Sequence, residues 1–141
     1  MADRAEQTDP SVRPRGERAT LPREARVRRR SVFRRVQSTG ERTHTKHFLV
    51  VQAPGEAPHP RLGVTVTKKV GNAVARNRIK RLLREFFRRH RDWFAGGVDV
   101  VFIAKRGAHT LSQAQLLEEM TRARRALRRA GLRSAKTKEI Q

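Results

Sequence analysis

Residues 68–89 read KKVGNAVARNRIKRLLREFFRR, and the rest of the chain is organised around this stretch. Gly71 permits a turn and Asn72 is a good helix N-cap, so a helix is predicted to begin after Asn72. At about 100° per residue, the apolar side chains fall on one side of that helix. They are Ala75, Ile79, Leu82, Leu83, Phe86 and Phe87. The stretch therefore predicts an amphipathic helix with one side in the core.

The other side of this helix is almost purely cationic, with Glu85 as its single acid. Four basic residues follow one another at i,i+4 spacing: Arg76, Lys80, Arg84 and Arg88. Such neighbours repel, whereas a solvent-facing helix normally mixes charge signs. A phosphate backbone would compensate the repulsion, because arginine binds phosphate in bidentate fashion and counterion release adds affinity. We therefore predict that this side binds nucleic acid.

Composition supports the same partner. The 141 residues include 34 Lys and Arg against 13 Asp and Glu, a formal net charge of +21. A charge of this size points to a polyanion. No apolar run approaches the roughly 18 residues that span a bilayer, and the N-terminus has no secretory signal pattern, so no membrane contact is expected. The absence of cysteine agrees with a cytoplasmic protein and excludes disulfides and thiolate zinc sites.

Upstream of the helix, residues 1–28 are rich in arginine and proline and are predicted to form a flexible basic tail. The domain is predicted to span residues 29–131. It should begin with a short helix capped by Ser31 and stopped by Gly40, which docks through Phe33 and Val36.

Two strands are predicted next, at residues 44–53 and 61–67, joined by the proline-rich PGEAPHP. We expect them to form an antiparallel pair. In the first strand, one face holds Phe48 and Val50, and the other holds His47, Leu49 and Val51. Both faces are partly apolar, so either helices cover both or one is a binding surface.

Downstream, Asp92, Gly96 and Gly97 should end the helix, with Trp93 and Phe94 over the core edge. Residues 98–104 (VDVVFIA) predict an internal strand parallel to the second one. A last helix has a capping box of Ser112 and Gln115, and we expect Gly131 to stop it before a polar tail at 132–141. Its apolar stripe is Leu116, Met120, Ala123 and Leu127.

The histidines show no zinc-binding or triad spacing. An independent nuclease built from His47, His90 or His109 is one alternative, and a structural RNA-binding protein, such as a ribosomal or assembly factor, is another. The residues alone predict a small α/β RNA-binding protein.

The string KKVGNAVARNRIKRLLREFF strongly resembles the Arg-Asn-Arg signature of the bacterial ribonuclease P protein subunit. The flanking segments HFLVV, RLGVTVTKK and VDVVFIAKRGA agree in order, over about residues 29–130. The resemblance implies an α/β (α+β) sandwich with a small mixed sheet, in which the signature helix forms a left-handed βαβ crossover.

The resemblance also implies a partner, the catalytic ribonuclease P RNA, and a substrate, precursor tRNA, with no obligate protein partner. The RNA would hold Mg²⁺ and cleave the 5′ leader, so the protein would carry no catalytic residue and no metal ligand. RNA-binding positions carried over from the helix and its approach are Lys68, Lys69, Arg76, Asn77, Arg78, Lys80, Arg81, Arg84 and Arg88. A leader-binding cleft would be lined by Phe33, Val36, Gln37, His47, Leu49 and Val51. Some relatives carry aromatics in place of Gln37 and Val51, so base stacking would rest on Phe33, which could also simply pack.

Overall fold

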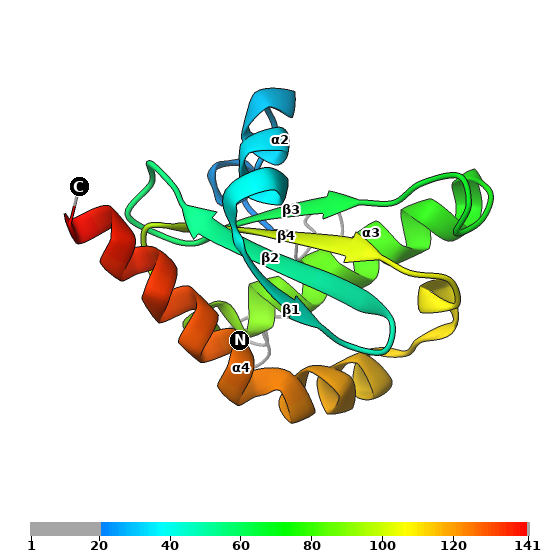
Figure 1. The fold of residues 1–141 in the computed structure, drawn as a ribbon. Coiled ribbons are helices and arrows are strands. Elements are labelled where there is room, and N and C mark those ends of the chain that lie inside the picture. The colour runs from blue at the N-terminus through cyan, green and yellow to red at the C-terminus, as the bar shows by residue number, and fades with distance from the viewer. Residues whose placement is uncertain (1–20, 141) are drawn as a thin grey trace, which may run out of the picture.

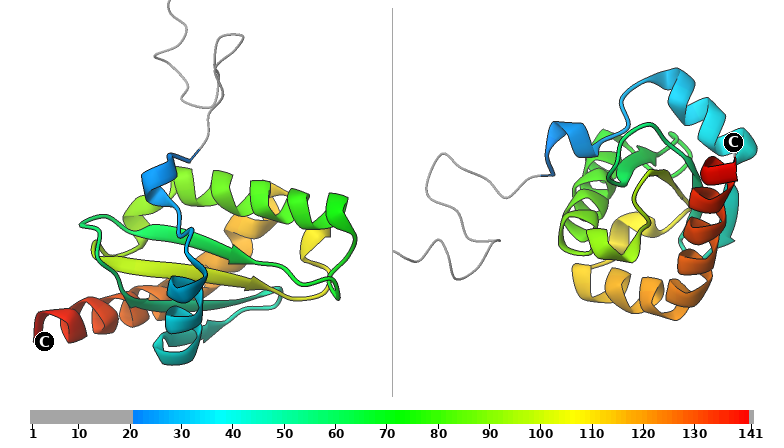
Figure 2. Two further views of the ribbon diagram at one scale, coloured as in Figure 1. Left: turned by 90° about the horizontal axis from the view of Figure 1, so that it is seen from above. Right: turned by 90° about the vertical axis from the view of Figure 1, so that its left-hand side faces the viewer.

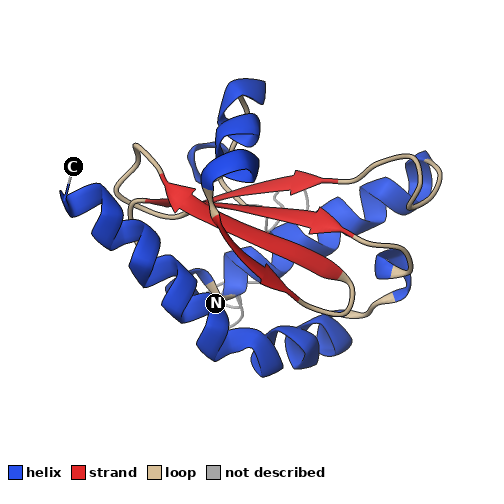
Figure 3. Cartoon of the chain, in the orientation of Figure 1, coloured by secondary structure: helices blue, strands red, loops and turns tan. Residues whose placement is uncertain are grey.

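The computed structural model describes residues 21–140, and a four-stranded mixed sheet with the order β1-β2-β4-β3 lies at its centre (Figures 1 and 3). The strands are β1 (Glu41–His44), β2 (Phe48–Pro54), β3 (Arg61–Thr65) and β4 (Val98–Ala104). The helices are α2 (Arg30–Thr39), α3 (Ala73–Arg89) and α4 (Gln113–Ile140), with short 3-10 turns η1 (Arg23–Ala25), η2 (Arg91–Trp93) and η3 (Ala108–Thr110).

Helices lie on both faces of the sheet, with α3 and α4 on one side and α2 on the other (Figure 2). Alternation along β2 therefore divides its side chains between two cores, which is one of the two alternatives that the sequence left open. Phe48 and Val50 join the larger core with the apolar side of α3. Val51 and Ala53 join a smaller core beneath α2.

The connection from β3 through α3 to β4 joins two parallel strands. In Figure 1 both strands run towards the right, with β3 above β4, and Figure 2 places α3 behind the sheet in that view. The crossover is therefore left-handed, as the resemblance implied and contrary to the strong general preference for right-handed βαβ units.

The predicted antiparallel pairing of residues 44–53 with 61–67 is wrong. β4 lies between the two strands, antiparallel to β2 over the whole length Phe48–Pro54 and parallel to β3. The reason is burial: β4 is apolar on both faces and nearly all of it is buried, so it takes a central position. The partner of β2 on its other side is β1, a strand that was not predicted.

The ordered fold begins before residue 29. Leu21, Ala25 and Val27 are buried, and Arg26 forms a parallel bridge with Leu62 beside β3. Residues 21–28 thus extend the sheet edge instead of belonging to a tail. The rest of the predicted tail, residues 1–20, lies outside the described residues.

Two helix caps are confirmed. The Asn72 side chain accepts a hydrogen bond from the Ala75 N–H at 2.9 Å, so α3 begins as predicted. At α4, the Gln115 N–H donates to Ser112 Oγ at 3.1 Å and the Ser112 N–H donates to Gln115 Oε1 at 2.9 Å. The predicted Ser31 cap is wrong, because α2 begins at Arg30 and its N-cap, Arg29, makes no side-chain capping bond.

Gly131 does not stop α4, which continues to Ile140. Gly131 allows α4 to pack closely against Gln52, since a Cβ at this position would lie 2.8 Å from Oε1 of the buried Gln52. One turn later, the buried Ser134 hydroxyl donates to the Gln52 carbonyl at 2.9 Å. The predicted polar tail is therefore helical from residue 132 to 140, and Ser134 packs against the sheet.

Gly40 does end α2, but not through a left-handed conformation, since its φ is −78°. A Cβ there would lie 2.5 Å from Val51 Cγ1 and 2.6 Å from the Val36 carbonyl oxygen.

We expect Gly40→Ala to lower the free energy of unfolding by about 2 kcal/mol, because buried backbone must move. Urea denaturation measures this. Ser38→Ala, at an exposed site in the same turn, should change it by less than about 0.5 kcal/mol, and equal losses in both variants would contradict the steric explanation.

Candidate nucleic-acid interface

The apolar side of α3 anchors the helix and turns its cations outward. Ile79, Leu82, Leu83, Phe86 and Phe87 are all buried against the sheet. On the opposite side, Asn77 and Arg81 are exposed. Lys68 and Lys69, in the turn that leads to α3, are exposed as well. The structure therefore brings these four predicted residues to the surface around one helix.

Other predicted RNA-binding residues also have partners within the protein. Arg78 donates from Nε to the His109 carbonyl at 2.7 Å and from Nη2 to the Leu111 carbonyl at 3.2 Å. Arg88 donates to both carboxylate oxygens of Glu85, at 3.0 and 2.6 Å. Arg76 donates to the Gly71 carbonyl at 3.1 Å. Arg78 ties α3 to the segment before α4, whereas the bonds of Arg76 and Arg88 are local to α3 and its approach. Because all three side chains have partners within the protein, Arg81 is the cleaner probe of RNA contact.

A cationic pocket of about 190 Å³ opens beside α3 at the β3 edge. Lys80 and Arg84 of α3 line it together with Arg26, Arg28 and Phe33. Burial lowers the pKa of Arg84, and the nearby charge of Arg26 lowers it further. An anion entering this pocket would offset both effects.

The sequence interpretation missed Arg26 and Arg28, because it assigned them to the tail. The signal that could have found them is the alternation of Ala25 and Val27 with these arginines, which is typical of a chain paired at a sheet edge.

On the α2 face of the sheet, the predicted leader residues differ in accessibility. Val36 and Val51 are 0% exposed and form the small core, so they cannot touch a nucleotide. Phe33 is half-buried and packs over Gly63, where a Cβ would lie 2.7 Å from Phe33 Cε1. Gln37 Nε2 donates to Thr65 Oγ1 at 3.0 Å. Leu49 is half-buried beside this core.

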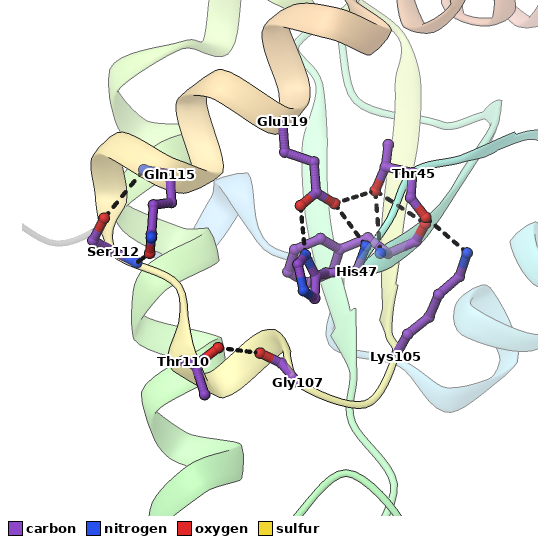
Figure 4. A network of polar contacts seen from close by, with 9 residues as sticks. Thr45, His47, Lys105, Gly107, Thr110, Ser112, Gln115 and Glu119 are labelled. Carbon is purple, nitrogen blue, oxygen red and sulfur yellow. Dashed lines mark hydrogen bonds and ion pairs between the residues drawn. The ribbon is translucent and has the colours of Figure 1, made fainter.

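His47 is not part of that group. It lies in the turn between β1 and β2, and its ring Nδ1 is 2.6 Å from Glu119 Oε1 of α4 (Figure 4). An ionised carboxylate only accepts, so Nδ1 donates. Glu119 Oε2 also accepts from the His47 N–H and from the Thr45 hydroxyl, both at 2.7 Å. Lys105 Nζ donates to the Thr45 carbonyl at 2.8 Å. The network fastens the β1–β2 turn to α4.

This network predicts an acid-sensitive contribution to stability. Burial alone would raise the pKa of Glu119, but the hydrogen bonds from His47 and Thr45 outweigh it and lower the pKa below its ordinary value of 4.5. A depressed pKa stabilises the fold above 4.5, and this stabilisation is lost as pH falls through the folded-state pKa. We expect the difference in unfolding free energy between the wild type and Glu119→Gln to shrink below pH 4.5. Urea titrations at pH 6 and pH 3 measure it; a difference independent of pH would contradict the assignment.

Asp99 is a buried ionic junction that the sequence interpretation did not single out. Its carboxylate is 1% exposed and accepts from Arg61 Nε at 2.7 Å, Arg61 Nη2 at 2.8 Å and Arg35 Nη2 at 3.0 Å. The hydrogen bond to Asp99 raises the pKa of Arg61, against the opposing effect of burial. Because Arg35 belongs to α2, this junction ties α2 to the central strand. The available signal was an acid inside an otherwise apolar strand.

Among residues 21–135, whose side chains the structure describes, no group of three or more His, Asp or Glu side chains is placed to hold a metal ion. The best-buried acids, Asp99 and Glu119, already accept hydrogen bonds from arginine and from His47. These side chains do not fit a Mg²⁺ site. Nor does any helix of the described part combine the length and apolar character needed to cross a membrane.

His90 lies at the opposite end of α3 from His109. His90 caps the C-terminal end of α3 and bonds the Phe86 carbonyl, whereas the carbonyl of His109 receives Arg78 near the other end. Arg78 and His90 are twelve positions apart along α3, which corresponds to about 18 Å. His47 is paired with Glu119 on α4.

Comparison with known proteins agrees with this architecture. The family model described as Ribonuclease P matches residues 21–130. The chain belongs to the ribonuclease P protein family. The ribonuclease P protein components of Syntrophus aciditrophicus and Desulfovibrio desulfuricans are 46% and 45% identical to it, over 72% and 73% of this chain and 85% and 82% of theirs.

Solved ribonuclease P proteins share the fold. The protein from Staphylococcus aureus is 33% identical with a TM-score of 0.62, over 70% of this chain and 94% of that one. The protein from Thermotoga maritima is 28% identical with a TM-score of 0.63, over 74% and 96%. The family match begins at residue 21, which agrees with the burial of Leu21 and Ala25. Membership in this family confirms the resemblance drawn from the Arg-Asn-Arg context.

Proposed function

We propose that this protein is the protein subunit of ribonuclease P, a tRNA-processing ribonucleoprotein, and that α3 binds its catalytic RNA. The observation that carries the proposal is the exposed cationic side of α3, in a chain of this family. Arg81 projects from the side opposite the buried stripe, and Lys68 and Lys69 extend the charge beyond the helix N-terminus. A phosphate backbone is the partner that offsets this repulsion.

The chemistry would belong to the RNA. Mg²⁺ bound there would activate water and stabilise the leaving oxygen when the 5′ leader of precursor tRNA is cleaved. The protein's contribution is electrostatic: its cations reduce repulsion between crowded phosphates, which lowers the Mg²⁺ concentration that the RNA needs. Phe33, Gln37 and Leu49 on the α2 face would contact the leader, with Phe33 the single aromatic side chain among them.

Reconstitution tests this function. The full-length protein is added to the cognate catalytic RNA at low Mg²⁺, and cleavage of precursor tRNA is followed with time. We expect the protein to increase the cleavage rate at low Mg²⁺ and to have less effect at high Mg²⁺. Unchanged cleavage at every Mg²⁺ concentration would overturn the proposal.

RNA-free protein is the essential control. One solved S. aureus relative, 31% identical, is a mutant described as defective in mRNA degradation activity. Cleavage of RNA by this protein alone, abolished by His90→Ala or His109→Ala, would favour an independent nuclease. Co-purification with ribosomal RNA instead of ribonuclease P RNA would favour the structural RNA-binding alternative.

A further inference from the structure

A second cationic groove lies at the edge of the sheet farthest from β3. β1 is the edge strand there, and α4 packs against it (Figure 1). The groove between them has a volume of about 390 Å³. Its lining is Arg42, Thr43, His44, Ala126, Arg129 and Arg133.

Three arginines, Arg42, Arg129 and Arg133, give the groove its positive charge. Arg133 pairs with Glu41 at 3.0 Å, but both side chains are about half exposed, so solvent weakens this bond. Arg129 is exposed and contacts no carboxylate among the described residues. Arg42 donates from Nη2 to the Gln37 carbonyl at 2.7 Å, which holds one arginine at the rim. Guanidinium groups in such a cluster match phosphate oxygens.

β1 connects this groove to the α2 face. In the β1–β2 ladder, Arg42 lies opposite Val51 and His44 lies opposite Leu49. Directly opposed residues point to the same face of a sheet, so Arg42 and His44 continue the row that begins at Leu49. Gln37, which shares the α2 face, is bonded to Arg42 through its carbonyl. A strand of RNA lying on the α2 face and crossing β1 would next meet Arg129 and Arg133.

From this continuity we propose that the β1–α4 groove binds the phosphate backbone of the precursor's 5′ leader at nucleotides remote from the cleavage site. The inference rests on the proposed function, because it takes α3 as the side that faces the catalytic RNA. α3 packs beneath β3 and β4, whereas the groove lies beyond β1, at the opposite edge. Leader nucleotides that reach the groove are therefore those farthest from the catalytic RNA.

The test compares precursors with a short and a long leader on the reconstituted holoenzyme. Arg129→Glu should weaken binding of the long-leader precursor about tenfold, the loss of one charge-assisted contact, and should leave short-leader binding within about twofold. It should also leave the affinity of the protein for the catalytic RNA unchanged. Lengthening the leader should therefore increase affinity in the wild type and not in this variant.

Arg128→Glu is the matched control. Arg128 is exposed on the same helix, one residue away, and does not line the groove. Because the substitution is the same, the change in net charge is identical. We expect it to preserve the leader-length effect. Equal losses in the two variants, or equal losses for short and long leaders, would overturn the groove assignment. If Arg129→Glu alters only the oligomeric state, the groove binds a second protein chain and the proposal fails.

A tethered probe locates the contact directly. Because the chain has no cysteine, Ala126→Cys in the groove and Val74→Cys, exposed at the start of α3, each give one attachment site for an iron chelate that generates hydroxyl radicals. We expect cleavage of leader nucleotides from position 126 and of the catalytic RNA from position 74. Cleavage of the catalytic RNA from both positions would overturn the inference. So would cleavage of the catalytic RNA from position 74 with no cleavage of the leader from position 126. No cleavage from either position would instead count against the proposed function.

Discussion

Asp99→Asn is expected to lower the free energy of unfolding by about 3 kcal/mol, because it removes the charge from a buried ion-pair junction. The carboxylate accepts three hydrogen bonds from Arg35 and Arg61, and a neutral amide cannot replace them all. Arg61 would keep its charge in a partly buried position without its counter-ion. Urea denaturation at pH 7 measures the loss.

Asp92→Asn is the control for this change. Asp92 is exposed, so the same substitution there should cost less than about 0.5 kcal/mol. Arg35 anchors α2 to Asp99, and α2 carries Phe33 and Gln37. The holoenzyme with Asp99→Asn should therefore lose affinity for precursor tRNA more than the protein loses affinity for the catalytic RNA. Similar stability in the two variants would show that solvation of Arg35 and Arg61 compensates the missing charge.

Arg81→Ala is expected to weaken binding to the catalytic RNA about tenfold, with the free energy of unfolding unchanged. The side chain is exposed and lies opposite the buried stripe of α3, so its loss leaves packing intact. One phosphate contact fewer should reduce the slope of log K against log salt by about 0.9 for a duplex and 0.7 for a single strand. Filter binding over a range of salt concentrations measures both quantities.

Arg78→Ala should behave differently. It removes two hydrogen bonds to the carbonyls of His109 and Leu111, so it should also destabilise the protein by about 1–2 kcal/mol. Arg106→Ala, at an exposed position in the turn after β4, is the charge-matched control. If Arg81→Ala and Arg106→Ala give the same affinity and the same salt slope, α3 does not face the RNA.

Local signals were enough to predict the elements that depend on them. The Asn72 cap and the Ser112–Gln115 capping box involve residues three apart, and both occur as expected. The stripe of α3 needs only helical periodicity, and it is buried as predicted. The family resemblance added the handedness of the crossover, which general rules would have given wrongly.

Long-range contacts were not predictable in the same way. Nothing in β2 or β3 alone shows that β4 separates them, since strand partners are chosen by the burial of the whole sheet. Gly131 shows the same limit. A glycine near a helix end is typical of a stop, but here it makes room for Gln52, a residue 79 positions earlier. The cationic pocket depends on Arg26 and Arg28 meeting Arg84, which only the folded chain brings together.

The central place of β4 also has a consequence for synthesis on the ribosome. β2 and β3 are made first, but in the folded sheet they do not pair with each other, because β4 lies between them. Until residue 104 has emerged from the ribosome, both strands keep an open edge, and the apolar side of α3 has no finished sheet to cover. The nascent chain therefore passes through a stage with exposed strand edges, which is the stage most open to aggregation. The sheet can be completed only after β4 has been made, and β4 is followed by a single large element, α4.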